Sequence, residues 1–312
     1  MKIISDPKVY TIEPCVAAIG FFDGVHKGHR YLIEQVKAIG LSKGLRTALI
    51  TFPVHPRKVI DPDYKLELLS TLKEKETLLS QAGVDYCFLL DFTAEISGLT
   101  AYDFMARILK KQFHVDSLII GYDHRFGHNR SEGFIDYSQY GKEIGMEVIH
   151  ARALTIEGRK VSSSVIRKAL LSAELDLANF YLGYNYSFDG VVVTGHKVGR
   201  TIGFPTANVS VDSDKLIPAD GVYAVRVSVE GNDYFGMINI GHRPTLNNGV
   251  NRTLEVNILH FSEDIYGKTI RVSLVKRIRS EVKFKGVEDL KVQLHNDRVN
   301  VEEIFKNEID LM

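Results

Sequence analysis

Gly20-Phe21-Phe22-Asp23-Gly24-Val25-His26-Lys27-Gly28-His29 follows the first clear strand pattern of the chain and opens its first helical pattern. In an open α/β sheet, ligands bind at the carboxyl ends of the strands, and the N-terminus of the next helix attracts phosphate. His26 and His29 can donate hydrogen bonds to a phosphorus centre as it gains charge. An ordinary glycine turn before a helix would look similar. The flanking Gly20, Phe21, Asp23 and Gly24 favour the phosphate site.

This stretch lies in a half of the chain where strand-like and helix-like periods alternate. The strand patterns cover residues 16–20, 46–52, 85–90, 117–121 and 146–150. Helical patterns begin near Gly28 and cover 72–82, 101–113 and 134–144. The alternation predicts an α/β domain in which helices cover both faces of a parallel sheet.

After about residue 183, strands follow one another closely, separated by glycine turns. Their patterns cover residues 187–194, 222–229, 234–240, 254–261 and 269–277. This half is predicted to form a small antiparallel β-barrel followed by an amphipathic helix over 287–307. Two short helices, 163–171 and 175–182, are expected to bridge the halves. We therefore expect two domains, 1–182 and 183–312.

Composition narrows the possible functions. The 312 residues are enough for about two domains. The 39 basic and 39 acidic residues give zero formal net charge, so we expect no nucleic-acid partner. No apolar run reaches the length of a membrane span, and the N-terminus has no signal core. The two cysteines, Cys15 and Cys87, lie in apolar runs, which predicts buried thiols in the reducing cytoplasm. The oligomeric state stays open.

Three more segments of the first half carry candidate ligands. Gly121 ends a strand, and the loop after it contains Asp123, Arg125 and Phe126, which suits a flat ring and phosphates. A solvated basic loop is the alternative. Ser163, Ser164 and Arg167 can hold a polyphosphate, although serines at a helix start are also good caps. Residues 51–57, which include His55 and Pro56, form a stiff loop or only a turn.

The most specific string of the second half is residues 195–208, a glycine-rich and basic turn suited to phosphates. Thr206 and Asn208 are two residues apart, so an extended backbone points both side chains to one face. Their oxygens suit a Mg²⁺ ion held mainly by substrate phosphates. Glu255, on a later strand, can act as a general base towards an alcohol. Turn chemistry and a solvent-facing carboxylate remain the plainer alternatives.

Taken together, these motifs resemble the bacterial bifunctional riboflavin kinase/FAD synthetase family over nearly the whole chain. The matching motifs, in family order, are GFFDGVHKGH (20–29), HP (55–56), IIGYDHRFG (119–127), SSSVIR (162–167), GRTIGFPTAN (199–208), PADGVYAV (218–225), NIGHRPT (239–245) and the LEV strand that carries Glu255. The resemblance implies a Rossmann-like HxGH nucleotidyltransferase domain and a riboflavin kinase-like barrel.

The resemblance also implies two reactions. In the barrel, the 5′-hydroxyl of riboflavin attacks the γ-phosphate of ATP and gives FMN. In the first domain, FMN attacks the α-phosphate of a second ATP and gives FAD and pyrophosphate. Mg²⁺ enters with ATP, and flavins are substrates or products.

Site residues are implied for each reaction. The catalytic residues are expected to be His26, His29, Arg167 and Glu255. ATP is expected to contact Gly20, Phe21, Asp23, Gly24, Gly121, Arg125, Ser163, Ser164, Gly195, Lys197, Gly199 and Gly203. The flavin is expected at His55, Pro56, Asp123 and Phe126, and the metal at Thr206 and Asn208.

Departures from the family motifs keep two alternatives open. Phe22 stands where Asn is common, Tyr122 and His124 alter the next loop, and Pro53-Val54 replaces a Glu-Pro pair. One alternative is therefore a riboflavin kinase whose first domain is inefficient or altered in substrate. The other is a flavin or nucleotide sensor that binds without turnover. Intact His26, His29, Asn208 and Glu255 argue against the sensor.

Overall fold

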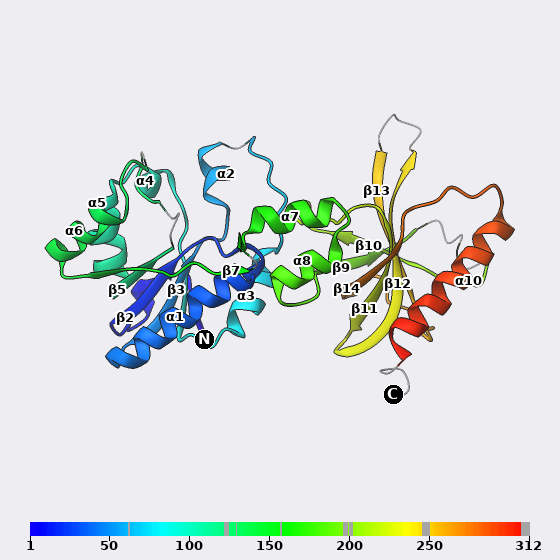
Figure 1. Cartoon of the computed structure of the whole chain (residues 1–312), viewed down its shortest axis with the longest axis horizontal. Coiled ribbons are helices and arrows are strands. Elements are labelled where there is room, and N and C mark those ends of the chain that lie inside the picture. Colours follow the sequence, from blue (N-terminus) through cyan, green and yellow to red (C-terminus); the bar gives the residue numbers. More distant parts are fainter. Residues whose placement is uncertain are drawn as a thin grey trace. The chain divides into compact units, whose positions relative to one another are not determined.

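Strands of the first half form one six-stranded parallel sheet with the order β1-β4-β3-β2-β5-β6. The computed structural model describes residues 1–61, 63–121, 125–128, 130–156, 158–195, 199, 202–244 and 250–306. The chain divides into two compact units, Met1–Ser163 and Ser164–Met312 (Figure 1). The strands of the sheet are β1 (Lys2–Ile4), β2 (Cys15–Ile19), β3 (Arg46–Thr51), β4 (Tyr86–Leu89), β5 (Val115–Ile120) and β6 (Glu147–His150).

The strand order places β2 at the switch point, where the chain stops adding strands on one side of the sheet and begins to add them on the other. The chain runs from β2 to β3 on one side, and later returns to add β5 on the other. Such a switch point leaves a crevice outside the carboxyl end of the central strand, which is where ligands bind in open α/β sheets. The turn at residues 20–29 leaves β2 at this position.

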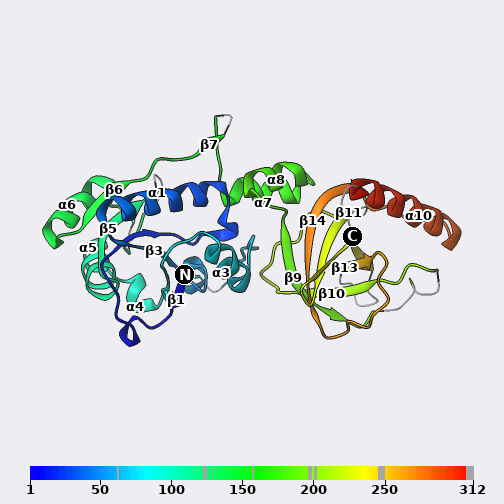
Figure 2. The ribbon, with the colours of Figure 1, turned by 90° about the horizontal axis from the view of Figure 1, so that it is seen from below.

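Alternate residues of the buried strands face two separate cores, which is why these strands read as continuous apolar runs. Ala17 and Ile19 of β2 pack on one face, and Val16 and Ala18 pack on the other. Helices cover both faces of the sheet (Figures 1 and 2). They are α1 (Lys27–Lys43) and α3 (Leu72–Ser80) on the side of Val16, and η3 (Phe104–Gln112) and α6 (Phe134–Ile144) on the side of Ala17.

Most predicted elements of this unit are present, and several additions were not predicted. Residues 101–113 are not one regular helix, because α5 (Ala101–Asp103) continues into the π-type helix η3. The expected stiff loop over 51–57 ends at His55, where Pro56 begins α2 with its φ already set for a helix. The unpredicted elements also include β1, α4 (Ala94–Ser97) and the hairpin of β7 (Thr155–Ile156) and β8 (Arg159–Lys160).

The second unit contains the closed antiparallel barrel that the strand spacing predicts, with the order β10-β13-β12-β11-β14-β9. Its strands are β9 (Ser187–Val193), β10 (Ala207–Val211), β11 (Gly221–Val229), β12 (Asn232–Pro244), β13 (Val250–Ile258) and β14 (Thr269–Arg279). Helices α7 (Ser163–Leu171) and α8 (Leu175–Leu182) precede the barrel, and α10 (Val287–Ile304) packs against it through Val301 (Figure 2).

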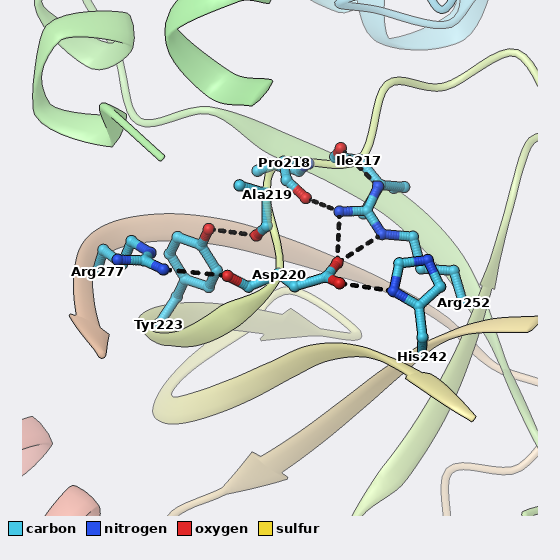
Figure 3. Close-up of polar contacts among 8 residues, drawn as sticks. All are labelled: Ile217, Pro218, Ala219, Asp220, Tyr223, His242, Arg252 and Arg277. Atoms are coloured by element: carbon cyan, nitrogen blue, oxygen red, sulfur yellow. Dashed lines mark hydrogen bonds and ion pairs between the residues drawn. The ribbon is translucent and has the colours of Figure 1, made fainter. Parts of the chain in front are cut away.

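Residues 217–220 lead into β11, and their four backbone carbonyls accept hydrogen bonds from side chains (Figure 3). Arg252 donates to the carbonyls of Ile217 and Pro218, Tyr223 donates to Ala219, and Arg277 donates to the carbonyl of Asp220. The carboxylate of Asp220 accepts from Arg252 at 3.1 Å and lies 2.6 Å from Nδ1 of His242. The segment before β11 is therefore held by a polar network in which the Nε of Arg277 is the one buried side-chain polar atom without a hydrogen-bond partner among the described residues.

Candidate functional sites

His26 and His29 begin helix α1 together. His26 is the N-cap residue, and its Nδ1 accepts a hydrogen bond from the backbone amide of His29 at 3.2 Å. Because Nδ1 is the acceptor, a neutral His26 ring carries its proton on Nε2 and can donate there. The two rings stack with centroids 3.7 Å apart and planes 13° from parallel. The sequence prediction that both imidazoles stand at one turn is therefore confirmed in position.

The His29 ring is held neutral by its surroundings. Burial is the main cause that lowers its pKa well below the ordinary value, and the charges of His26 and Lys75 lower it further. Its buried Nδ1 has no hydrogen-bond partner within the described part of the chain. A buried polar atom with unused capacity at a sheet switch point is a reasonable place for a ligand to bind.

Asp23 links the turn at residues 20–29 to the segment before α3. Its buried carboxylate accepts hydrogen bonds from the backbone amides of Leu69 and Ser70 at 3.1 and 3.0 Å. The hydroxyl of Ser70 accepts from the amide of Gly24, whose φ of 74° favours glycine, and the hydroxyl of Ser163 donates to the carbonyl of Asp23. The predicted ATP contact at Asp23 thus falls on a residue whose carboxylate is committed to the fold, whereas Gly24 lies beside it in the turn.

The loop after β3 brings aromatic side chains to the same sheet edge. The His55 ring caps α2 and meets the ring of Phe21 edge-on at 4.6 Å. Tyr64 lies 5.8 Å from His55 and contacts Arg57 through its hydroxyl and ring. Phe21 and His55, two predicted ligand contacts, are therefore together. Tyr64 had no sequence signal beyond being aromatic.

The loop after β5 is fastened to α6. Tyr137 bonds to both backbone groups of Phe126, and the two rings stack at 4.1 Å. The guanidinium of Arg125 donates to the carbonyls of Ser131 and Glu132. One face of the Phe126 ring is therefore covered by Tyr137. The predicted contact Asp123, with Tyr122 and His124, lies outside the described residues, as does Lys197. Ser164 and Arg167 lie on α7 in the second unit.

A polar row crosses three strands of the barrel. Glu255 of β13 pairs in register with Asn208 of β10 on one side and with Asn239 of β12 on the other. Side chains at matching register positions point to the same face of a sheet and lie about 5 Å apart. The structure thus brings the predicted base and one predicted metal ligand together. It adds Asn239, which the sequence analysis quoted in a motif without giving it a role.

Two cavities lie beside β13, and one of them reaches this polar row. The first, of about 480 Å³, is lined by Glu255, Asn239 and residues of α10. The second, of about 510 Å³, is lined by Val256, Ile258 and residues 261–266. Thr206 lines both cavities, and alternate residues of β13 face different ones. The two cavities therefore lie on opposite faces of β13 and share Thr206 as a lining residue.

Gly195 lies close to the side chain of Asn208 on β10. A Cβ at Gly195 would lie 2.1 Å from the amide nitrogen of Asn208, so only glycine fits beside that side chain. Gly199 accepts hydrogen bonds from the amides of Ile202 and Phe204, and Gly203 has a φ of 82°. Of the predicted phosphate contacts, Gly195 therefore lies beside Asn208, and Gly199 lines the first cavity together with Thr206.

A buried ion pair forms part of the first cavity and was not predicted. Asp297 of α10 is fully buried, and Arg279 at the end of β14 donates to both of its oxygens at 2.7 to 3.0 Å. Gln293 completes the carboxylate's bonds at 2.9 Å. The only sequence signal was opposite charge on separate elements, which does not identify partners.

Comparison with protein families decides the assignment. The family model described as FAD synthetase matches residues 9–165, and the model described as riboflavin kinase matches residues 182–305. The chain belongs to the bifunctional riboflavin kinase/FMN adenylyltransferase family. Since both models match, the two-activity interpretation is favoured over a kinase whose first domain is inefficient or altered in substrate.

Relatives extend the family match over the whole chain. A bifunctional riboflavin kinase/FMN adenylyltransferase from Listeria monocytogenes is 39% identical over 93% of this chain and 92% of its own length. The enzyme of the same name from Escherichia coli K12 is 37% identical over 94% and 93%. A crystal structure titled macrolide-efflux protein from Streptococcus pneumoniae has 33% identity and a TM-score of 0.87, and covers 96% of this chain and 98% of that one.

The described residues contain no helix that combines the length and the apolar character needed to cross a membrane.

Proposed function

We propose that the chain makes FAD from riboflavin in two steps, with the barrel unit as the kinase and the parallel-sheet unit as the adenylyltransferase. The observation that supports the kinase activity is the position of Glu255, which is in register with Asn208 and Asn239 on the neighbouring strands. Two cavities lie beside this strand, and Thr206 lines both of them. One cavity would hold the flavin and the other would hold ATP. The functional domains would follow the predicted limits, 1–182 and 183–312.

In the kinase step, Glu255 accepts the proton of the riboflavin 5′-hydroxyl as its oxygen attacks the γ-phosphorus of ATP. The bond from that phosphorus to the β-phosphate oxygen breaks, and ADP leaves with both electrons. The enzyme's task is mainly to align the two substrates and to stabilise charge. The turn that contains Gly195, Gly199 and Gly203 would surround the phosphates, together with Lys197.

Mg²⁺ is expected to enter this site with ATP as part of the substrate. The donor set fits the ion, because a hydroxyl at Thr206 and an amide oxygen at Asn208 are hard, neutral ligands beside one carboxylate. No group of three or more His, Cys, Asp or Glu residues suited to a metal occurs among the described residues. Substrate phosphates would therefore supply most of the ligands.

In the adenylyl-transfer step, a phosphate oxygen of FMN attacks the α-phosphorus of a second ATP. The bond to the bridging oxygen of the β-phosphate breaks, and pyrophosphate leaves. His26 would donate from Nε2, and the neutral His29 ring would supply a second donor to the α-phosphate oxygens. Gly20 and Gly24 let the backbone come close, while Ser163, Ser164 and Arg167 would hold the leaving pyrophosphate. Phe21, His55, Pro56, Gly121 and Arg125 are the remaining described contacts expected at this edge.

We also propose that the enzyme works in the reducing cytoplasm. Cys15 and Cys87 are free, buried thiols, and burial raises the pKa of each to about 12. They suit a compartment where thiols stay reduced, although they do not require it.

Incubation of the protein with riboflavin and Mg-ATP, followed by chromatography, tests the proposal. FMN should appear first and FAD should follow, with ADP and pyrophosphate as co-products. Supplying FMN instead of riboflavin should give FAD without ADP. FMN that accumulates without FAD would leave only the kinase. No ADP from riboflavin, together with no FAD or pyrophosphate from FMN, would favour the sensor.

A further inference from the structure

Lys75 is a buried cation beneath the adenylyl-transfer turn. It lies on α3, and its side chain is only 2% exposed. Its ammonium donates to the carbonyl of Phe52 at 2.8 Å and to the carbonyl of Phe21 at 3.2 Å, and it lies 4.1 Å from the centre of the Phe21 ring. Lys75 had no place in the sequence motifs.

The two carbonyls belong to the loops that build the site. Phe21 follows β2 and begins the turn with His26 and His29, whereas Phe52 directly follows β3 and begins the loop with His55. One ammonium therefore joins the starting points of both loops. Thr51 adds a second donor to the Phe21 carbonyl at 3.1 Å, so this point is held from two directions.

Holding a charge here is costly. Burial lowers the pKa of Lys75 to about 8, although the nearby Asp23, Cys87 and Glu76 favour the charged form. In return, the charge helps to lower the pKa of His29. Asp23 and His29 face Lys75 from the turn, Cys87 faces it from β4, and Glu76 lies on the same helix. A cation kept in such a place is typical of a functional site.

We propose that Lys75 is a positioning residue for adenylyl transfer, which sets the imidazole turn and the His55 loop in register with each other through its charged contacts to both carbonyls. This rests on the proposed function of the parallel-sheet unit. The neutral amine keeps two N–H groups, but it loses the charge that strengthens both bonds. The site should therefore lose its alignment as the ammonium deprotonates.

The test compares Lys75→Met, Lys75→Arg and the control Lys73→Met, which changes an exposed lysine on the same helix. FAD formation from FMN and Mg-ATP is measured from pH 6 to 10 in the full chain, with FMN formation from riboflavin alongside. Lys75→Met should lower kcat for FAD formation by about 10²-fold, which is the cost of a misplaced catalytic group. The control variant and every kinase rate should stay within about twofold of the wild type.

The pH profile separates positioning from simple support of the fold. The wild-type rate of FAD formation should fall as the pH rises past about 8. Lys75→Arg, which stays charged, should keep more than about a tenth of the wild-type rate and lose this basic limb. Wild-type kcat in Lys75→Met, or an unchanged basic limb in both variants, would overturn the proposal. A wild-type protein that makes no FAD at all would instead refute the adenylyltransferase function itself.

Discussion

The rings of His26 and His29 stack at 3.7 Å, and His26 at the same time caps the helix that carries His29. One hydrogen bond thus fixes the ring orientation and the tautomer of His26. The cap and the ring stack therefore hold the two imidazoles together at the N-terminus of α1.

Replacing His29 with alanine should lower the rate of FAD formation from FMN by about 10²–10³-fold, the usual cost of losing one transition-state donor. FMN formation from riboflavin should be unaffected, since Glu255 lies in the other unit. Separate assays of the two steps measure this. His260→Ala, at an exposed histidine of the barrel, is the control. Loss of both activities in a folded His29→Ala protein would show that the sites are not independent.

Glu255→Gln keeps the shape of the side chain and removes the base. FMN formation should fall by about 10²–10⁴-fold, the range that general-base catalysis contributes. FAD formation from supplied FMN should continue. Glu230→Gln, at an exposed carboxylate paired with Lys268, provides a matched control. A kinase that tolerates Glu255→Gln would require a different base.

Gly195→Ala should displace the Asn208 side chain, because the new Cβ would meet its amide nitrogen at 2.1 Å. We expect the kinase to need more Mg²⁺ and to lose about tenfold in rate, the equivalent of one lost hydrogen bond. A magnesium titration of FMN formation checks this. Gly231→Ala, at the β11–β12 turn, is the control for replacing a glycine. A Cβ at this position meets no other atom, and the φ of 88° makes the substitution strain only the backbone. An unchanged magnesium dependence in Gly195→Ala would remove Asn208 from the metal site.

Asp297→Ala should destabilise the barrel unit by about 3–5 kcal/mol, because it leaves Arg279 as a partly buried charge without its carboxylate. Denaturant unfolding measures this loss. The double variant Arg279→Met/Asp297→Leu should recover most of it, since apolar replacement of a buried pair is often neutral. Equal stability of Asp297→Ala and the wild type would contradict the buried pair.

The buried ammonium of Lys75 should also appear in the pH dependence of stability. Its pKa is about 8 in the folded chain, whereas the ordinary value of 10.5 applies in the unfolded chain. Between these pH values the folded state binds fewer protons, so the free energy of unfolding should rise with pH. The wild type should gain about 3 kcal/mol relative to Lys75→Met across this window. Urea unfolding at pH 7.5, 9 and 10.5 measures the difference, and parallel curves for the two proteins would refute the low pKa.

The sequence predicted the layers of the fold because apolar periods depend on neighbouring residues. The small antiparallel barrel and helices such as α6, 134–144 in both prediction and structure, follow from those periods, whereas the barrel strand β10 was not predicted. Short elements escaped: β1 has three residues, and α2 has five. Such segments are too short to show a hydrophobic period in the sequence, and their structure depends on contacts with neighbouring elements.

Site residues were predictable where the motif and the contact lie in one segment, as at His26 and His29. Partners from distant segments were not predictable. Asn239 joins Glu255 through strand register, and Lys75 reaches Phe21 across 54 residues of sequence. Neither pairing leaves a local pattern. Asp23 is a further case, because the backbone amides that its carboxylate accepts from, at Leu69 and Ser70, lie more than 40 residues away in the sequence.

The placement of Glu255 between two asparagines on neighbouring strands has a consequence for how this enzyme can change over time. A deletion of one residue in β13 would rotate the carboxylate to the opposite face of the sheet and abolish phosphorylation in a single event. Insertions and deletions of single residues are therefore blocked along the strands. Variation in flavin preference among descendants should accumulate instead in α10 and the turns, where insertions leave the strand pairing intact.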